Sequence, residues 1–349
     1  MTKQVMCGNV AIGGGAPISI QSMTNVSSTD EKELVRQISS LAAAGCDIVR
    51  VAVPDMEAAE TLKKVKKQIA IPLVADIHFD YRLAVAAIAS GADKIRINPG
   101  NIGDANRVRE VVKAASERNI PIRVGVNSGS LEKDIIEKNG GVTAEGLAES
   151  ALRNLRLIED MGYDNLVVSL KSSDVAMNYH AHKIVSEGTE HPIHIGITEA
   201  GTIRRGQLKS AAGLSPLLLQ GIGDTMRISM TADPVEEVIF AKELLAILGM
   251  AEGGVNIVSC PTCGRTKIDL QGLAEAVEKR MNEEKIAHNI TIAVMGCAVN
   301  GPGEAKSADY GVAGGQGKGI IFSKGKIIKT TPEEHLLDEL IGIIKADIK

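Results

Sequence analysis

The chain has 349 residues, with 39 Lys and Arg against 43 Asp and Glu, no Trp, three Phe and four Tyr. This length exceeds one ordinary hydrophobic core, so we expect two domains. The balanced charge and the scarcity of aromatic side chains argue against binding to nucleic acid. No apolar run approaches the roughly 20 residues that span a bilayer, and the first seven residues lack the apolar stretch of a signal peptide. We therefore expect a cytoplasmic protein that binds neither nucleic acid nor membrane.

Residues 18–250 alternate between strand-like and helix-like segments. Eight segments are rich in Val and Ile, which is typical of parallel strands buried on both faces. These predicted strands are residues 18–24, 47–53, 73–79, 94–98, 122–127, 166–172, 193–198 and 225–230. Eight strand–helix units in about 230 residues have the size and rhythm of a (β/α)8 TIM barrel. We assign residues 1–252 to this barrel as the substrate-binding domain.

Capping residues support the helices between these strands. Asp30, Asp55 and Asp233 stand where helical segments begin, and Gly or Asn stands where others end. Before the first barrel strand, the glycine run at residues 13–15 suggests an N-terminal hairpin outside the barrel.

The pattern changes at Gly253 and Gly254, and residues 253–349 are expected to form a small α/β domain that carries three of the five cysteines. It begins with a strand near residues 255–259, a helix near 270–285 and a strand at 290–295. A glycine-rich stretch at residues 310–319 fails the P-loop pattern, so we interpret it as a tight turn or a mobile cover. A hairpin around residues 322–326 and a helix from Pro332 onward complete the domain.

Five of the predicted barrel strands carry a cation among apolar neighbours. These cations are Arg50, Arg96, Arg123, Lys171 and Arg227. Burying an unpaired cation is costly, and five would repel one another unless something anionic lies among them. A phosphate-rich ligand meets that need, since Arg makes bidentate contacts with phosphate oxygens. For a single cation, snorkelling or pairing with a structural carboxylate is an equal alternative, but for all five together the ligand is favoured.

Polar residues also stand at the carboxyl ends of the strands, where barrel enzymes place their active sites. They are Asp76, His78, Asn98, Asn127, Ser172, Thr198, Glu199 and Ser229. Asp76 and His78 share one face of their strand and are expected to contact substrate together. Glu199 ends its strand in a glycine-rich turn, where it serves either as a proton donor to the ligand or as the counter-charge of an Arg.

Three of the five cysteines fall in the last ninety residues. Cys260 and Cys263 form a Cys-x2-Cys pair, and Cys297 is followed after a Gly/Pro turn by Glu304. Three thiolates and one oxygen ligand suit an iron–sulfur cluster with one distinct iron. Zinc is the main alternative, although a zinc site expects two close pairs of Cys or His, and a redox disulfide leaves the third cysteine unexplained. Cys7 and Cys46 are expected to have no ligand role.

Taken together, the motifs resemble one family over essentially the whole chain, the 4-hydroxy-3-methylbut-2-enyl diphosphate synthases. The resemblance is carried by residues 21–25 (QSMTN), 47–50 (DIVR), 94–101 (KIRINPGN), 169–173 (SLKSS), 196–201 (GITEAG), 260–265 (CPTCGR) and 296–304 (GCAVNGPGE). The length resembles the compact bacterial form of the family, without an additional domain between the two units.

The resemblance implies an oxidoreductase that opens the ring of 2-C-methyl-D-erythritol 2,4-cyclodiphosphate and removes water, giving (E)-4-hydroxy-3-methylbut-2-enyl diphosphate for isoprenoid synthesis. It implies a [4Fe-4S] cluster and reduced flavodoxin or ferredoxin as the electron donor. The implied cluster ligands are Cys260, Cys263, Cys297 and Glu304. The implied diphosphate pocket is lined by Arg50, Arg96, Arg123, Asn127, Lys171, Arg227 and Ser229.

We add Asp76, His78 and Thr198 to the expected substrate-binding residues, because they stand at the same strand ends. The resemblance implies a catalytic role for Glu199, which we expect to protonate the departing hydroxyl. We expect Glu304 to be an exchangeable ligand, because a carboxylate leaves iron more readily than a thiolate does, and we count it as catalytic. A compact dianion matches five cations, so the residues and the resemblance agree.

The connection between the domains predicts an assembly. A helix over residues 233–249 is about 25 Å long and runs back from the barrel mouth, whereas residues 251–254 reach only about 14 Å. We therefore expect a head-to-tail homodimer in which each cluster domain covers the mouth of its partner's barrel. Two other functions stay open: acid–base chemistry on a phosphorylated substrate with a structural zinc domain, and an iron–sulfur carrier or redox sensor.

Overall fold

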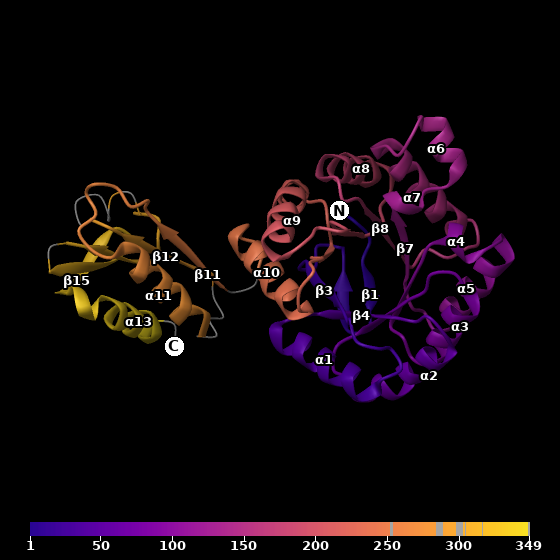
Figure 1. Cartoon of the computed structure of the whole chain (residues 1–349), viewed down its shortest axis with the longest axis horizontal. Coiled ribbons are helices and arrows are strands. Elements are labelled where there is room, and N and C mark those ends of the chain that lie inside the picture. The colour runs from indigo at the N-terminus through magenta and orange to yellow at the C-terminus, as the bar shows by residue number, and fades with distance from the viewer. Residues whose placement is uncertain (252–253, 284–288, 298–302, 304, 316, 348–349) are drawn as a thin grey trace. The chain divides into compact units, whose positions relative to one another are not determined.

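The computed structural model describes residues 1–251, 254–283, 289–297, 303, 305–315 and 317–347. The chain forms two compact units, Met1–Leu244 and Leu245–Lys349, and Figure 1 labels many of their elements. The expected domain boundary at residues 252 and 253 lies outside the described residues and stays a prediction. Within the described ranges, no helix has both the length and the apolar character needed to cross a membrane.

Eight parallel strands close the barrel of the first unit in the order β10-β3-β4-β5-β6-β7-β8-β9. The strands are β3 Ser19–Met23, β4 Ile48–Ala52, β5 Leu73–Asp76, β6 Lys94–Ile97, β7 Ile122–Asn127, β8 Leu166–Lys171, β9 Ile193–Gly196 and β10 Thr225–Arg227. The predicted (β/α)8 barrel is therefore confirmed. Several strands end earlier than expected, because their last polar residues leave the hydrogen-bond ladder and enter the loops at the mouth.

The barrel helices surround these strands in Figure 1. They are α1 Glu31–Ala44, α2 Met56–Val65, α3 Tyr81–Ala89, α4 Pro99–Ile102, α5 Ala105–Glu117, α6 Lys133–Asn139, α7 Ala144–Glu159, α8 Val175–Gly188, α9 Ile203–Leu218 and α10 Pro234–Ile247, with a 3-10 turn η1 Ser128–Ser130. The predicted caps are present: Asp30 accepts from the Glu33 amide at 3.1 Å and Asp55 from the Ala58 amide at 2.8 Å.

Strand register brings polar residues together inside the barrel. Asp76 lies opposite Arg96, Arg96 lies opposite Arg123, and Asn127 lies opposite Lys171 on adjacent strands. Side chains alternate between the two faces of a strand, so Asp76, Arg96 and Arg123 share the inward face with their paired neighbours.

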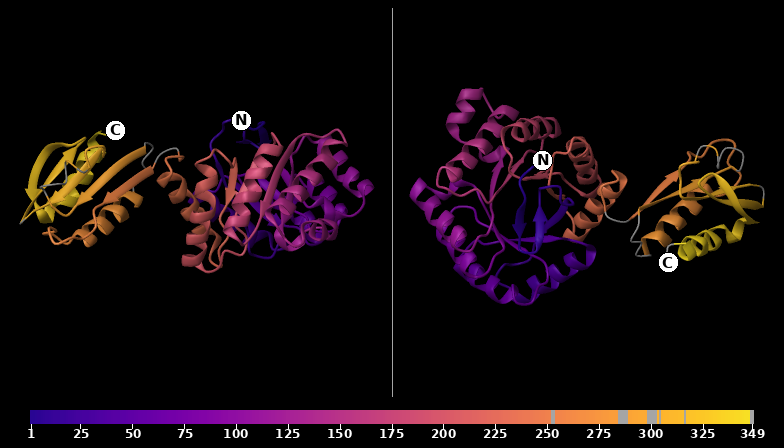
Figure 2. Two further views of the ribbon diagram at one scale, coloured as in Figure 1. Left: turned by 90° about the horizontal axis from the view of Figure 1, so that it is seen from above. Right: turned by 180° about the vertical axis from the view of Figure 1, so that it is seen from behind.

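An antiparallel hairpin precedes the barrel, with β1 Val5–Cys7 paired to β2 Val10–Ile12. Cys7 and Ile12 pack against Ile48 and Val74 of the barrel strands, and Figure 2 shows the indigo hairpin at one end of the barrel. The expected hairpin exists, but its turn is not the glycine run at residues 13–15. The turn lies at Gly8, whose φ of 57° suits a two-residue connection, and the glycine run follows β2.

The second unit is a five-stranded sheet in the order β11-β12-β13-β14-β15. Its elements are β11 Gly254–Ser259, α11 Leu270–Glu283, β12 Asn289–Met295, β13 Tyr310–Gly314, β14 Lys318–Ser323, β15 Lys326–Pro332, a 3-10 turn η2 Glu333–His335 and α13 Leu336–Asp347. The predicted strands, hairpin and helices are confirmed. Their core joins Val277 and Leu340 of the helices to Ile292 and Ile321 of the sheet.

The interpretation of residues 310–319 as a tight turn or a mobile cover is wrong for residues 310–314 and 318–319, which belong to strands. Residues in this stretch form β13 and the start of β14, which pair antiparallel. The glycines serve packing: a Cβ on Gly311 would collide with the ring of Phe322, and one on Gly319 would lie 2.5 Å from Leu336 Cδ1. Glycine is required here because large side chains occupy the space above the strands.

Candidate active site

The structure brings the five strand cations together inside the barrel. Arg123 is 1% exposed, Arg96 is 7% exposed and Lys171 is 8% exposed, while the Arg50 and Arg227 side chains are 13% and 16% exposed. Each arises from a different strand, so closure of the barrel sets them facing one another. Such a set carries a large repulsion unless anionic groups lie among it.

Asp76 is the first of two buried carboxylates beside these cations. Its oxygens lie 3.7 Å from Arg50 Nε, 3.4 Å from Arg96 Nη1 and 3.1 Å from His78 Nε2. Burial raises the pKa of Asp76, but Arg50, the hydrogen bond with His78 and Arg96 together hold it well below its usual range. Asp76 therefore remains a carboxylate that positions two arginines and one histidine at the mouth.

Glu237 is the second buried carboxylate, and the sequence reasoning missed it. It projects from α10, is 3% exposed, and places Oε2 3.5 Å from Arg227 Nη2. Its oxygens also accept from the Met230 amide at 2.9 Å and from Ser22 Oγ at 3.3 Å. Glu237 lies in the first turn of a helix, where an acidic residue is usually a surface group that favours the helix dipole, so its sequence position gave no signal.

Two glycines make room for the cations. A Cβ on Gly125 would collide with Arg96 Nε, and one on Gly196 would lie 2.9 Å from Lys171 Nζ and 2.8 Å from the Arg227 carbonyl oxygen. Arg96 Nη2 also donates to the Gly125 carbonyl at 3.2 Å. The two strands therefore carry glycine where a long cationic side chain crosses the barrel.

Arg123 and Lys171 are less well compensated than the other three cations. Burial and the neighbouring arginines Arg50 and Arg96 lower the pKa of Arg123 well below its ordinary value. Burial and four surrounding arginines likewise lower the pKa of Lys171. Within the described part of the chain, neither cation forms an ion pair with a carboxylate. An anion bound among them would supply the missing charge.

Below the five cations lies a buried polar layer that the sequence analysis also missed. His194 and Lys94 are both 0% exposed, and among the described residues Lys94 Nζ and the two ring nitrogens of His194 have no hydrogen-bond partner. Burial and the charge of Arg123 lower the pKa of His194 well below 6.5, and burial lowers that of Lys94 to about 8. Strand alternation could have indicated this layer in the sequence. His194 is two residues before Gly196 on β9, so both residues lie on the inward face of the strand.

The remaining predicted residues stand at the mouth. Asn127, Thr198 and Ser229 are half-buried, and His78 and Glu199 are exposed. Glu199 has a φ of 51°, a left-handed conformation that non-glycine residues rarely adopt and that is found preferentially at functional sites. The turn therefore presents the Glu199 carboxylate at the mouth.

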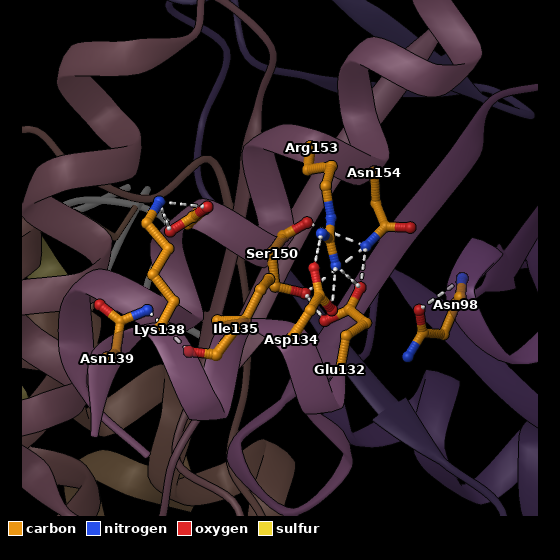
Figure 3. A network of polar contacts seen from close by, with 11 residues as sticks. Asn98, Glu132, Asp134, Ile135, Lys138, Asn139, Ser150, Arg153 and Asn154 are labelled. Carbon is orange, nitrogen blue, oxygen red and sulfur yellow. Dashed lines mark hydrogen bonds and ion pairs between the residues drawn. The ribbon is translucent and has the colours of Figure 1, made fainter. Parts of the chain in front are cut away.

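A separate polar network fixes the loops beyond β6 and β7 (Figure 3). Glu132 accepts from Ser150 Oγ at 2.6 Å and from Asn154 Nδ2 at 2.9 Å, and Arg153 lies 3.4 Å away. These contacts join the start of α6 to α7. A Cβ on Gly100, in the short helix α4 after β6, would lie 3.3 Å from Glu132 Oε1, so α4 packs directly on the network.

In the second unit, Cys260 follows β11 and Cys297 lies just beyond β12, and these two strands are parallel neighbours. The Gly296 amide donates to Cys260 Sγ at 3.3 Å, and the Lys267 amide donates to the Gly296 carbonyl at 3.3 Å. Cys263 lies in the loop between these contacts. Hydrogen bonds from the backbone and the guanidinium of Arg265 lower the pKa of the Cys263 thiol, which favours the thiolate.

The donor atoms of this set, rather than their spacing, suit a group ligated by thiolates. Three thiols come from two neighbouring strand ends and one connecting loop, and sulfur ligands suit an iron–sulfur cluster. Among the described residues, no three His, Cys, Asp or Glu side chains are grouped closely enough to hold a metal ion. Glu304, the expected fourth ligand, lies outside the described residues. Cys7 and Cys46 are buried in the first unit, where burial raises the pKa of both thiols, that of Cys46 to about 12.

Both units match models of one protein family. Residues 2–242 match the GcpE TIM-barrel domain and residues 256–346 match the GcpE protein C-terminal domain. The chain belongs to the GcpE family. The family resemblance found in the sequence motifs is therefore confirmed.

Three full-length relatives carry the same name, 4-hydroxy-3-methylbut-2-en-1-yl diphosphate synthase (flavodoxin). The protein from Caldanaerobacter subterraneus subsp. tengcongensis is 54% identical over 349 residues, covering 100% of this chain and 98% of the relative. That from Clostridium acetobutylicum is 53% identical over 340 residues, covering 97% of each chain. That from Geobacter sulfurreducens is 52% identical over 344 residues, covering 99% of this chain and 97% of the relative.

Solved structures share the barrel fold at low identity. Dihydropteroate synthase from Stenotrophomonas maltophilia has a TM-score of 0.52 at 14% identity, over 72% of this chain and 100% of that one. Phospho-2-dehydro-3-deoxyheptonate aldolase from Thermotoga maritima has a TM-score of 0.50 at 14% identity, over 71% of this chain and 73% of that one. These similarities support the fold of the first unit and carry no information on substrate.

Proposed function

We propose that the chain is an oxidoreductase that converts 2-C-methyl-D-erythritol 2,4-cyclodiphosphate to (E)-4-hydroxy-3-methylbut-2-enyl diphosphate, by reductive ring opening with loss of water. Relatives at 52% to 54% identity that match it over nearly their whole length are named for this product. The observation that carries the proposal is the barrel interior, in which five cations from five strands face two buried carboxylates. The excess of positive charge is suited to a compact diphosphate dianion.

The charge distribution suggests how the substrate is held. Asp76 compensates Arg50 and Arg96, and Glu237 compensates Arg227, so these arginines are held in place before the ligand arrives. Arg123 and Lys171 then supply the charge that the diphosphate neutralises. Preorganised cations of this kind bind phosphate oxygens without reorganisation when the ligand enters.

The mouth residues are proposed to act on the rest of the substrate. Asn127, Thr198 and Ser229 offer amide and hydroxyl groups at half-buried positions suited to binding the sugar-derived carbons and the diphosphate oxygens. His78 is held by its contact with Asp76, and it would face the ligand together with Asn127, Thr198 and Ser229. Glu199, presented by its left-handed turn, would donate the proton that leaves with the hydroxyl as water.

The proposed cofactor is a [4Fe-4S] cluster held by Cys260, Cys263, Cys297 and Glu304. When bound, the cluster supplies the two electrons that the ring opening consumes, and the relatives' names point to reduced flavodoxin as their source. The Arg265 contacts that favour the Cys263 thiolate support this role for the loop. We retain residues 1–252 and 253–349 as the proposed substrate and cluster domains.

We further propose that the functional unit is a head-to-tail homodimer, in which the cluster domain of one chain serves the barrel of the other. Support comes from the short connection between α10 and β11 argued from the sequence. In such a dimer the cluster domain would cover the mouth of the barrel. It would therefore have to move away when substrate enters.

The test is anaerobic purification followed by analysis and turnover. We expect a brown protein containing iron and sulfide, which converts the cyclic diphosphate to the linear product when reduced flavodoxin is supplied. Arg123→Met should lower kcat/KM roughly ten- to hundredfold at unchanged iron content, because a charged hydrogen-bond donor is lost. Arg36→Met, on the exposed face of α1, is the matched control. A colourless, zinc-loaded protein without turnover would support the alternative acid–base enzyme.

A further inference from the structure

Lys171 differs from the other cations of the substrate site in both its surroundings and its chemistry. It is 8% exposed, and its ammonium is within electrostatic range of Arg50, Arg96, Arg123 and Arg227 from four other strands. An arginine keeps its charge at every accessible pH, whereas a buried lysine readily loses its proton. Lys171 is therefore the member of this set that can relieve the repulsion by becoming neutral.

The two buried carboxylates beside the site, Asp76 and Glu237, already pair with other cations, and Glu199 stands exposed at the mouth. Asp76 lies 3.7 Å from Arg50 Nε and 3.4 Å from Arg96 Nη1, and Glu237 lies 3.5 Å from Arg227 Nη2. No ion pair to Lys171 is formed in the part of the chain that the structure describes. Lys171 Nζ instead occupies the space above Gly196, where a Cβ would lie 2.9 Å away.

The other groups packed around Lys171 cannot offset its charge. His194 of β9 and His182 of α8 lie within electrostatic range, and burial lowers the pKa of both, that of His182 to about 4. Both imidazoles are therefore neutral near pH 7. Across the strand pair, Asn127 of β7 is uncharged. Burial and four like charges thus act on Lys171 with no carboxylate paired to it in the described ranges, and they lower its pKa well below 10.5.

We propose that Lys171 loses its proton in part of the neutral to mildly alkaline range when the barrel is free, and regains it when the diphosphate dianion binds. This inference rests on the proposed function and adds that substrate binding is linked to the uptake of one proton. The bound anion supplies the counter-charge that Lys171 lacks, so protonation of the amine and binding of the ligand stabilise each other.

The substrate makes this linkage measurable. Each phosphoryl group of a cyclic diphosphate carries one strongly acidic hydroxyl, so the ligand is fully ionised near neutral pH and exchanges no proton itself. Any proton taken up on binding must therefore enter the protein. Because protons are taken up, the affinity should fall as the pH rises through the range in which free Lys171 is neutral.

The experiment is isothermal titration calorimetry of the full chain, prepared without air, with the cyclic diphosphate and no reductant, so that no turnover occurs. Titrations in buffers of different ionisation enthalpy give the number of protons taken up, at several values between about pH 6 and about pH 9. We expect uptake to approach about one proton per ligand in part of this range. Lys171→Arg should bind with uptake near zero, since its charge is permanent, and Lys171→Met should bind more weakly, also without uptake. Lys138→Arg, an exposed lysine paired with Glu149, should behave as wild type.

Lys94 provides the decisive comparison, because it is also buried and its pKa is lowered to about 8. If uptake persists in both Lys171 variants and disappears in Lys94→Met, the acceptor is Lys94 and the inference is wrong. Wild-type binding without uptake at any pH overturns it as well, whether or not the variants fold. Failure of the wild-type protein to bind the cyclic diphosphate would instead contradict the proposed function.

Discussion

Asp76 shows how one buried carboxylate can organise a substrate site at the scale of a residue. It contacts Arg50, Arg96 and His78, which arise from two other strands and from the loop after its own strand. Because its pKa lies below the unfolded value, its stabilisation is complete above about pH 4 and is lost only as the pH falls toward the folded pKa. Asp76 is therefore charged at every pH at which the protein would work.

Replacement of Asp76 by Asn should destabilise the free protein by roughly 3–5 kcal/mol at neutral pH, because two buried arginines lose their counter-charge. Addition of the cyclic diphosphate should restore part of this loss, since the ligand binds only the folded state. Urea denaturation with and without ligand measures both effects. Asp80→Asn is the control, because Asp80 is a helix cap at which Asn serves equally well. Equal stability of Asp76→Asn and wild type would contradict the assigned role.

His182 gives a separate pH dependence. The His182 ring donates from Nδ1 to the Asn178 carbonyl at 2.7 Å. Burial lowers the pKa of His182 to about 4. In the unfolded chain His182 is protonated below about pH 6.5, whereas in the folded protein it stays neutral until about pH 4. Protonation therefore favours the unfolded state between these values, and the free energy of unfolding should fall as the pH is lowered through this window. His182→Gln should reduce that slope by up to about 1.4 kcal/mol per pH unit, measured by denaturation at a series of pH values. An unchanged slope would show that His182 is protonated in the fold.

At the scale of an element, strands of the barrel combine apolar outward faces with glycine where a cation crosses the interior. β9 illustrates this, since His194 and Gly196 share the inward face and Lys171 lies above the glycine. In the second unit, the glycines of β13 and β14 admit the ring of Phe322 and the side chain of Leu336. Glycine in these strands therefore marks close packing rather than a turn.

Gly196→Ala should displace Lys171, because the added Cβ would lie 2.9 Å from Lys171 Nζ and 2.8 Å from the Arg227 carbonyl oxygen. We expect a stability loss of about 1–3 kcal/mol from overpacking, together with a higher KM for the cyclic diphosphate. Thermal unfolding and steady-state kinetics measure the two effects. Gly342→Ala, at an exposed helical position with open space around it, is the matched control: it should leave KM unchanged and raise stability by about 0.5–1 kcal/mol, because Ala favours a helix more than Gly does. Normal KM in Gly196→Ala would show that Lys171 does not touch the substrate.

At the scale of the whole molecule, the two units divide the proposed chemistry. The first holds the cations and Glu199, and the second holds Cys260, Cys263 and Cys297. Neither unit alone contains both the proposed diphosphate site and the three cysteines proposed as ligands. The head-to-tail homodimer proposed above would bring them together between chains.

Mixed dimers test this sharing. Glu199→Gln and Cys297→Ser should each be inactive alone, one lacking a barrel residue and the other a cluster ligand. After the two proteins are unfolded or dissociated and reassembled together, roughly a quarter of wild-type activity should return, because half of the dimers are mixed and each of these has one intact site. Product formation with reduced flavodoxin is the measurement. No recovery, despite mixed dimers seen by mass spectrometry, would place each active site within one chain.

The sequence by itself determined the barrel, the helix caps and the cations, because these follow from local rules. Val- and Ile-rich segments at regular spacing define buried parallel strands, and an Arg such as Arg123 within one of them is conspicuous at once. Family motifs identified the expected ligands and substrate pocket by the same local patterns.

Only the tertiary structure decided which charges compensate one another. Glu237 reaches Ser22 across 215 residues of sequence, and Asp76 pairs with arginines on both neighbouring strands, because closure of the barrel and its strand register fix these contacts. The same closure buries His194 with no hydrogen-bond partner in the described part of the chain and leaves Lys171 among four arginines. A local sequence pattern does not determine the distances between side chains on different strands. The charge balance of the site is therefore a property of the folded barrel.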